Sequence, residues 1–335
     1  MLTHIAHWMA QYHVDGLRLD SVNNYNNWDF AGSVRDNARK DWKLRWQAEG
    51  NPPQGFDERF LVVGEELSVP KDLLKHLDGL WNEEFKRILR QVILGHSDGG
   101  DSFESSVRKL IDCRNLGFSD GAQAVNYIGS HDVGGQGNER LYNYLDFNGV
   151  TLKDKQIKLA FACLLTAVGI PMILAGDEFA DEHDIDIFHG GTGGHTPDDN
   201  KQIDPVNFDR LDKDPWRQQV LEYVARLVKF RTRSDALAVN DTKFIHVDFN
   251  DGKRVLVWQR GRDGVDDPVV VVANFSDFGT ANAFSPGAAY VVSNFPATPT
   301  GKRWREIGQD REVPNGQAGR EPIFPWEAKV YALQA

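Results

Sequence analysis

The sequence predicts an α/β region followed by an all-β region, and the texture of the chain supports this division. Up to residue 237, short apolar runs alternate with longer helical patterns. From residue 238 on, strand patterns follow one another with Gly, Pro, Asp and Asn between them. Strands that alternate with helices are typical of a parallel sheet with crossover connections. We therefore expect two domains, residues 1–237 and residues 238–335.

The helices and strands of the first domain follow from the spacing of its apolar residues. Residues 2–12 and residues 151–168 each place their apolar side chains on one face of a helix. Thr151 is expected to cap the second of these helices. The pair Asp214 and Pro215 is typical of a further helix start. The strands expected in this domain are 14–20, 60–64, 79–81, 122–128 and 170–175.

The second domain is predicted to be a β-sandwich. Its strand patterns alternate within about 100 residues, which is a usual size for such a domain. A segment of this size can enclose a core, so we expect it to fold independently. The strands expected here are 244–248, 254–258, 269–275, 290–292 and 329–333.

Composition and charge exclude several classes of partner. The 335 residues are 41% hydrophobic and 26% charged, as in globular proteins. Because 49 acidic residues outnumber 38 basic ones, the net charge is −11. Phosphate binding needs clustered positive charge, so we expect neither nucleic acid nor an anionic membrane as a partner. The first residues lack the basic and apolar regions of a signal peptide, and we therefore expect a cytoplasmic protein.

Charged side chains stand where three of the predicted strands end. Asp20 ends the first strand, Glu65 follows the second, and His131 and Asp132 follow the fourth. The carboxyl ends of parallel strands share one face, and active sites form on that face. Arg18 lies two residues before Asp20 and so points to the same side of its strand. Taken singly, such residues are more often helix caps or surface ion pairs.

Carboxylates that converge need a chemical reason, because like charges raise one another's pKa. Glycoside hydrolysis supplies one. A carboxylate attacks the anomeric carbon while a protonated carboxylic acid donates to the leaving oxygen. Arg18 beside Asp20 would keep that carboxylate ionised through a charge-assisted hydrogen bond. The pattern therefore indicates a glycosidase.

Four motifs resemble those of glycoside hydrolase family 13, the α-amylase family, and they occur in the family's order. Residues 15–20, Asp-Gly-Leu-Arg-Leu-Asp, look like the fourth-strand motif, and residues 62–65, Val-Val-Gly-Glu, look like the fifth. Residues 130–132, Ser-His-Asp, look like the seventh-strand motif. The segment 169–178 is similar to the eighth.

The resemblance implies a fold and a set of roles. Residues 1–237 would be the carboxyl-terminal five-eighths of a (β/α)8 TIM barrel, strands four to eight, followed by the β-sandwich. The activity would be retaining, double-displacement hydrolysis of α-1,4-glucosidic bonds in an α-glucan or maltooligosaccharide. Asp20 would be the nucleophile, Glu65 the acid/base and Asp132 the stabiliser of the transition state. Arg18 and His131 would bind the substrate or hold the carboxylates.

The chain also departs from the family pattern. The first motif, which carries an Asp and a His for the substrate and an Asn for a structural calcium, has no counterpart. Asn23 and Asn24 stand where many α-amylases have Lys and His. We therefore expect no metal and no cofactor. Because the pattern begins just before the fourth strand, we expect the chain alone to be inactive, to self-associate, or to need a partner that supplies the missing amino-terminal barrel segment.

Two other functions stay open. A sugar hydroxyl in place of water would give transfer, as in a branching enzyme or another transglycosylase. The chain would otherwise be a non-catalytic fragment or one half of a split enzyme. Hydrolysis is preferred because it needs no second sugar site.

Other conspicuous residues have plainer interpretations. Glu66 is expected to be a loop or subsite residue beside Glu65. The acidic and His-rich segment 181–195 fits no metal-ligand spacing, and we expect a solvated loop there. Four tryptophans are candidates for stacking on glucose rings, but most should pack in the core. They are Trp28, Trp42, Trp46 and Trp81.

Overall fold

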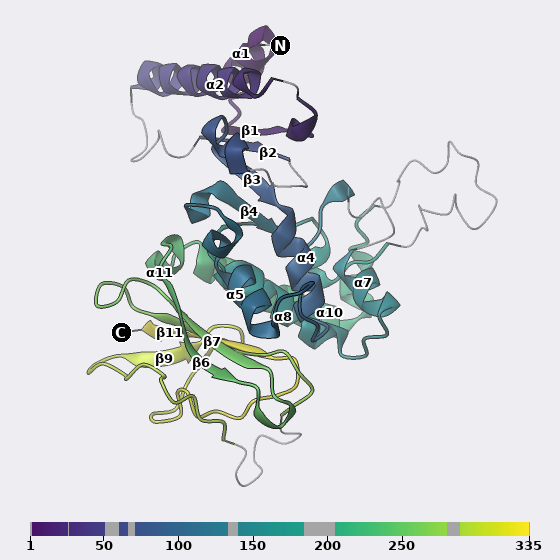
Figure 1. Ribbon diagram of the computed structural model, residues 1–335, viewed down its shortest axis with the longest axis vertical. Coiled ribbons are helices and arrows are strands. Elements are labelled where there is room, and N and C mark those ends of the chain that lie inside the picture. The colour runs from purple at the N-terminus through teal and green to yellow at the C-terminus, as the bar shows by residue number, and fades with distance from the viewer. Residues whose placement is uncertain are drawn as a thin grey trace, which may run out of the picture.

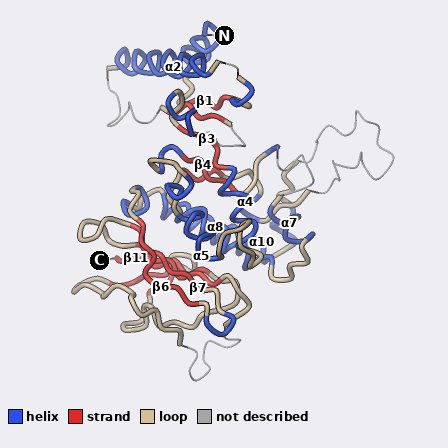
Figure 2. The backbone as a smooth tube through the Cα atoms, viewed as in Figure 1, coloured by secondary structure: helices blue, strands red, loops and turns tan. Residues whose placement is uncertain are grey.

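The computed structural model describes residues 2–25, 27–50, 60–65, 71–132, 140–183, 205–279 and 289–334. These residues form one parallel and one antiparallel sheet with helices around and between them (Figures 1 and 2). The strands of the parallel sheet are β1 (Gly16–Leu19), β2 (Leu61–Gly64), β3 (Gly79–Asn82), β4 (Ala124–Tyr127) and β5 (Ile170–Met172). Those of the antiparallel sheet are β6 (Thr242–Asp248), β7 (Val255–Arg260), β8 (Val269–Asn274), β9 (Arg303–Glu306), β10 (Arg311–Glu312) and β11 (Ala328–Gln334).

The helices lie between most of the consecutive parallel strands, before β1 and after β5. They are α1 (Leu2–Tyr12), α2 (Trp28–Glu49), α4 (Glu83–Val92), α5 (Phe103–Ile111), α7 (Leu141–Phe147), α8 (Lys153–Thr166), α9 (Asp209–Lys213), α10 (Pro215–Arg231) and α11 (Asp235–Ala238). Pro215 is the first residue of α10, as its fixed φ favours. The prediction that Thr151 caps α8 is wrong. That helix begins at Lys153 after Leu152, whose side chain makes no capping hydrogen bond.

The five parallel strands lie in sequence order, from β1 to β5. All residues of β3 and β4 are buried, whereas β1 and β5, at the edges of the described sheet, are partly exposed. Strand pairing places Arg18 beside Val63, Val63 beside Gly79, and Trp81, two residues after Gly79, beside Val125. Because side chains alternate between the faces of a strand, these residues share the inner face of the sheet. The fold class is thereby confirmed as a partial (β/α)8 barrel followed by a β domain.

The antiparallel sheet has the strand order β10-β9-β11-β8-β7-β6. The predicted strand at 290–292 is wrong, since only an isolated bridge between Ala289 and Pro322 forms there. Strands β9 and β10 were not predicted. In β9, charged residues flank Trp304, and only Trp304 and Glu306 are buried, so the sequence lacks a clear apolar alternation.

One face of the antiparallel sheet packs on the helices of the barrel. Trp258, Val271 and Val330 of this face belong to the same buried cluster as Phe161 of α8. In Figure 1, α5, α8 and α10 lie between β4 and the antiparallel sheet. The opposite face, with Val257, Val270 and Tyr331, packs under loops of the β domain. The described β domain is therefore covered on one side by the barrel helices.

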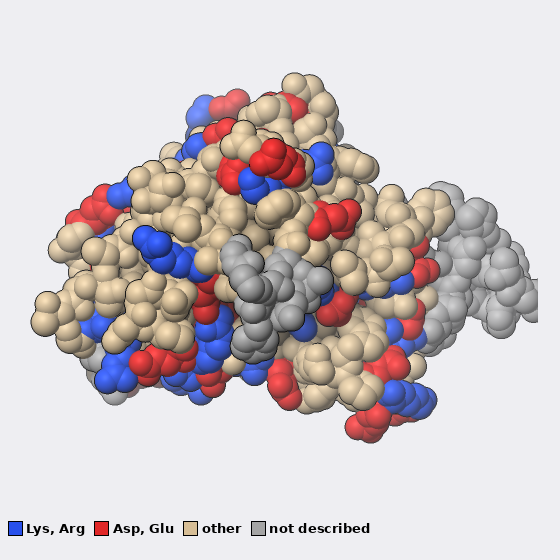
Figure 3. Space-filling model, turned by 90° about the horizontal axis from the view of Figure 1, so that it is seen from below, with Lys and Arg blue, Asp and Glu red and all other residues tan. Residues whose placement is uncertain are grey.

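Acidic and basic side chains lie interspersed on the face of the molecule shown in Figure 3. Many charged side chains form exposed pairs, such as Arg303 with Glu312, at 3.1 Å between nitrogen and oxygen. Such pairs contribute little stability singly. Within the described ranges, none of the helices combines the length and the apolar character that a membrane span requires.

Candidate active site

The first two strands of the barrel portion bring Asp20 and Glu65 together. The parallel register pairs Leu19 with Gly64, so the next residue of each strand is Asp20 or Glu65. A Cβ on Gly64 would lie only 2.7 Å from Leu77 Cδ1, which explains why glycine precedes Glu65. The Glu65 N–H donates to the Leu19 carbonyl at 2.8 Å. The backbone of both strand ends is therefore fixed.

Arg18 links the predicted carboxylates. Its Nη1 lies 2.8 Å from Asp20 Oδ1, and its Nη2 lies 2.7 Å from Glu65 Oε2. The same Nη2 is 3.8 Å from Asp132 Oδ2. One guanidinium thus reaches three acidic side chains that come from the ends of β1, β2 and β4. The planar group can bind two carboxylates through separate nitrogens, which a lysine ammonium cannot reproduce geometrically.

The turn after Asp20 supplies a further hydrogen bond. Ser21 has φ 46° and ψ 49°, a left-handed conformation that is uncommon outside glycine. In this conformation its N–H donates to Glu65 Oε2 at 2.9 Å. Backbone strain of this kind clusters at functional sites. This contact could not be predicted from the sequence, because serine is not a residue type that favours a positive φ.

Asp20 and Glu65 occupy different environments. The Glu65 side chain is 10% exposed and that of Asp20 is 75% exposed. Burial raises the pKa of Glu65, and the nearby Asp20 and Asp132 raise it further, against the lowering by the Ser21 N–H and Arg18. A buried carboxyl with a raised pKa beside an open carboxylate can divide the roles of acid and nucleophile.

His131 and Asp132 reach the site from the segment after β4. His131 Nε2 lies 3.2 Å from Asp132 Oδ2, and both side chains are more than half exposed. The backbone before His131 is closely packed, since a Cβ on Gly129 would lie only 2.9 Å from Asp177 Oδ2. The structure thus brings all five predicted site residues, with Arg18 at the centre, to one end of the sheet.

Trp81 also lies at the site, although the sequence left open whether it stacks there or packs in the core. Arg18 lies over its ring, with Cζ 4.5 Å from the ring centroid. Trp42 is buried in a cluster that includes Met9 of α1 and Ala31 of α2, which we call the α1–α2 cluster. Trp28 and Trp46 are partly buried against the same cluster, as expected for residues that pack in the fold. The period-2 pattern of β3 was the available signal, because it places Trp81 on the inner face at the carboxyl end of the strand.

The other predicted features lie apart from this site or outside the described residues. Glu66 and residues 184–195 fall outside the described ranges. Asp181 pairs with Arg210, and Glu182 with Arg217. In the ranges that the structure describes, no group of three His, Cys, Asp or Glu residues is arranged to hold a metal ion.

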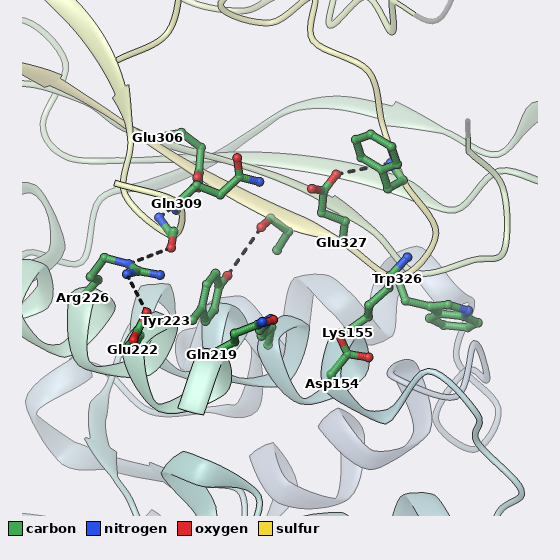
Figure 4. A pocket seen from close by; sticks show the side chains of 14 residues that line it. Asp154, Lys155, Gln219, Glu222, Tyr223, Arg226, Glu306, Gln309, Trp326 and Glu327 are labelled. Carbon is green, nitrogen blue, oxygen red and sulfur yellow. Dashed lines mark hydrogen bonds and ion pairs between the residues drawn. The ribbon is translucent and has the colours of Figure 1, made fainter. Parts of the chain in front are cut away.

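A cavity of about 440 Å³ lies away from the strand ends, between α8 and α10 and the β domain (Figure 4). Figure 4 shows Tyr223 and Arg226 on the helix wall, with Glu306 and Glu327 on the facing wall. The Glu306 carboxylate accepts from three backbone N–H groups and is fully engaged in the fold. We therefore place the candidate active site at the strand ends and treat this cavity as part of the interface.

Comparisons with known proteins give a consistent result. No protein-family model matches the chain. Malto-oligosyltrehalose trehalohydrolase of Saccharolobus solfataricus is 22% identical over 272 residues, which are 69% of this chain and 45% of that protein. Chloroplastic isoamylase 1 of Arabidopsis thaliana is 22% identical over 305 residues, 71% of this chain and 35% of that protein. The chain thus spans less than half the length of these curated relatives.

Solved structures share the fold. The α-amylase of Geobacillus thermoleovorans, complexed with acarbose, superimposes with a TM-score of 0.64 at 20% identity. The match covers 100% of this chain and 63% of that one. Together with the four strand-end motifs, these matches confirm the resemblance of the chain to glycoside hydrolase family 13, the α-amylase family.

Proposed function

We propose that this chain carries the catalytic carboxylates of a retaining glycoside hydrolase that acts on α-glucans. The observation that carries the proposal is the single guanidinium of Arg18, held by Asp20 at 2.8 Å and by Glu65 at 2.7 Å at adjacent strand ends. A carboxyl separation of about 5–5.5 Å is typical of retention, and about 6.5–9.5 Å of inversion. Two carboxylates that bind neighbouring nitrogens of one guanidinium favour the shorter class.

The proposed first step uses the unequal environments of the two groups. Asp20 attacks the anomeric carbon through a carboxylate oxygen, and the bond from that carbon to the leaving oxygen breaks. The bonding electrons go to the leaving oxygen, which takes the proton of Glu65. Burial favours the protonated form of Glu65 that this step requires. Arg18 Nη1 binds Asp20 Oδ1 at 2.8 Å and so holds this carboxyl group beside Glu65.

The second step reverses the role of Glu65. Its carboxylate takes a proton from water, and the water oxygen attacks the anomeric carbon. The bond to Asp20 then breaks, and its electrons return to the carboxylate. His131 and Asp132, which are exposed beside Arg18, would bind sugar hydroxyls. This exchange leaves every group as it began.

The substrate class is inferred from similar proteins. They include a malto-oligosyltrehalose trehalohydrolase, an isoamylase and an acarbose-bound α-amylase. We therefore propose an α-linked glucose oligosaccharide as substrate and α-1,4 bonds as the first linkage to test. Transfer to a sugar hydroxyl is the alternative, and the products distinguish it, since hydrolysis increases reducing ends and transfer does not.

The test is sugar release from maltoheptaose by the full chain and by three variants. Asp20→Asn keeps the shape but removes the nucleophile, and turnover should fall to background. Glu65→Gln should lower kcat by about 10²–10⁴-fold, the usual contribution of a general acid–base group. Asp72→Asn is the control, because Asp72 is exposed and pairs with Lys75, away from the strand ends. Sugar release by Asp20→Asn at the rate of the wild type would contradict the role of Asp20 as the nucleophile.

If the chain alone releases no sugar, the same variants are assayed after an amino-terminal barrel segment of a full-length relative is added in trans. Restored activity that depends on Asp20 would support the half-enzyme interpretation. Restored activity that survives Asp20→Asn would remove Asp20 from the mechanism.

A further inference from the structure

Trp81 packs against Arg18, the residue that contacts both the Asp20 and the Glu65 carboxyl groups. The Arg18 guanidinium lies over the indole, with Cζ 4.5 Å from the ring centroid. The indole makes an edge contact with His131 at 6.2 Å between centroids and packs on Tyr127 at 5.3 Å. Although Trp81 stands on the inner face of a sheet with exposed edges, it is only 5% exposed. It therefore has neighbours on the site side and on the core side.

The geometry of the stack suits what Arg18 does. A guanidinium over an aromatic face keeps its N–H groups free for partners that lie in its own plane. Arg18 uses Nη1 for Asp20 and Nη2 for Glu65. The Arg18 side chain is 30% exposed. Without the Trp81 indole packed against it, this side chain would have several rotamers of similar energy, and each rotamer would aim the two nitrogens differently.

Trp81 is itself held firmly. All four residues of β3 are buried, and the strand pairs with β2 and β4. Tyr127, on the neighbouring strand, fixes the ring from the core side and is fully buried. A rigid element behind a flexible cation is the arrangement that preorganises a site.

We propose that Trp81 is a positioning residue, which fixes the plane of the Arg18 guanidinium and thereby the places of the Asp20 and Glu65 carboxyl groups. The contact between Trp81 and Arg18 does not depend on the proposed function. Only the expected consequence for turnover rests on the proposed function.

The proposal makes a prediction about Glu65 that needs no turnover. Arg18 is one of the groups that lower the pKa of Glu65, together with the Ser21 N–H. Burial, Asp20 and Asp132 act in the opposite direction. If Arg18 moves when the indole is lost, it lowers the pKa of Glu65 less, and the pKa of Glu65 therefore rises.

The experiment is carried out by NMR on the full chain. The Arg18 side-chain N–H resonance is assigned with Arg18→Lys, and the Glu65 carboxyl resonance with Glu65→Gln. In the wild type, the Arg18 resonance should be shifted upfield by the indole ring. In Trp81→Leu this shift should disappear, and the pKa of Glu65 should rise by about 0.5 or more, a fraction of the effect of a full ion-pair partner. Trp81→Phe keeps a ring and should restore much of both signals.

The matched control is Trp42→Leu. Trp42 is also buried and also lies beneath an arginine, since Arg45 Cζ is 4.4 Å from its ring centroid. It belongs to the α1–α2 cluster, and its loss should leave the pKa of Glu65 unchanged. A pKa change of the same size in the control would show a general loss of packing and would overturn the proposal.

Two further outcomes would overturn the proposed role of Trp81, and a third would separate it from the proposed function. An Arg18 resonance without upfield shift in the wild type overturns the proposal even if Trp81→Leu fails to fold. An unchanged pKa of Glu65 in a folded Trp81→Leu overturns it too. If the NMR signals change as expected but sugar release never depends on Asp20, the proposed function fails and the positioning role of Trp81 stands.

Discussion

The central strands of both sheets are covered more completely than the edge strands of the described parallel sheet. Every residue of β3, β4, β7 and β8 is buried, whereas no residue of β1 or β5 reaches full burial. The antiparallel sheet packs on barrel helices with one face and on its own loops with the other. The candidate active site, by contrast, begins on β1, an edge of the described parallel sheet. Stability is thus concentrated away from the site, as is usual for binding regions.

The difference also revises an expectation about the β domain. Its size suggests that it folds alone, but Trp258, Val271 and Val330 form a common cluster with barrel helices. Without those helices, this face would be exposed to water. Large exposed apolar faces cause association or loss of a unique fold.

The largest expected effect therefore comes from separating the two regions. Residues 238–335, expressed alone, should lack a cooperative thermal transition and should aggregate, because one face of the sheet loses its cover. The measurement is thermal unfolding by circular dichroism together with light scattering, with the full chain as control. A monodisperse segment with a sharp transition would show that the loops of the β domain provide a sufficient core.

A smaller effect is expected from one residue of the shared face. Trp258 is 0% exposed, and Trp258→Ala should lower the free energy of unfolding by about 3–5 kcal/mol. Urea denaturation measures the change. The matched control is Trp8→Ala on α1, where the side chain is 51% exposed and the loss should be below about 1 kcal/mol. Similar losses at both positions would contradict the contrast between the two regions.

The next effect concerns the polar contact between the regions. Arg260 of β7 is fully buried and donates to the carbonyl oxygens of Thr166, at the end of α8, and Val239. Arg260→Met should lower the free energy of unfolding by about 2–3 kcal/mol, because buried carbonyl groups lose their donors. Arg303→Met is the control, since Arg303 is exposed and pairs with Glu312. Its expected loss is below about 1 kcal/mol. Equal urea midpoints for the two variants would contradict a structural role of the buried contacts.

The sequence predicted the features that depend on local pattern. Apolar runs located all five parallel strands, and the strand ends located Asp20, Glu65 and Asp132, because the carboxyl ends of parallel strands meet. Features that depend on distant partners could not be read in this way. Alternation in β7 indicates that Val257 and Trp258 point to opposite faces, but not that a barrel helix covers one of them. Likewise, nothing near Trp81 in the sequence indicates that Arg18 stacks on it.

The smallest expected effect is a pH dependence that arises where the two regions meet. Burial raises the pKa of Glu327 to about 7, against the lowering by Lys329 and the Phe324 N–H. The folded state therefore keeps a proton that the unfolded chain releases near its ordinary value of 4.5. Stability from this group is complete below about pH 4.5 and is lost as the pH rises towards 7. Glutamine cannot ionise, so Glu327→Gln removes this contribution.

Urea unfolding at pH 5 and pH 7.5 measures the contribution of Glu327. Between these values the wild type should lose about 1–2 kcal/mol more stability than Glu327→Gln, since a tenfold change in proton affinity corresponds to about 1.4 kcal/mol and partial solvent access reduces it. Asp177, whose pKa burial raises to about 6, titrates in both proteins and cancels in the difference. Glu312→Gln is the control, because its carboxylate is 55% exposed. If the wild type and Glu327→Gln lose the same stability over this range, Glu327 is ionised in the folded state, and the interface between the regions is more open to water than the contacts of the sheet imply.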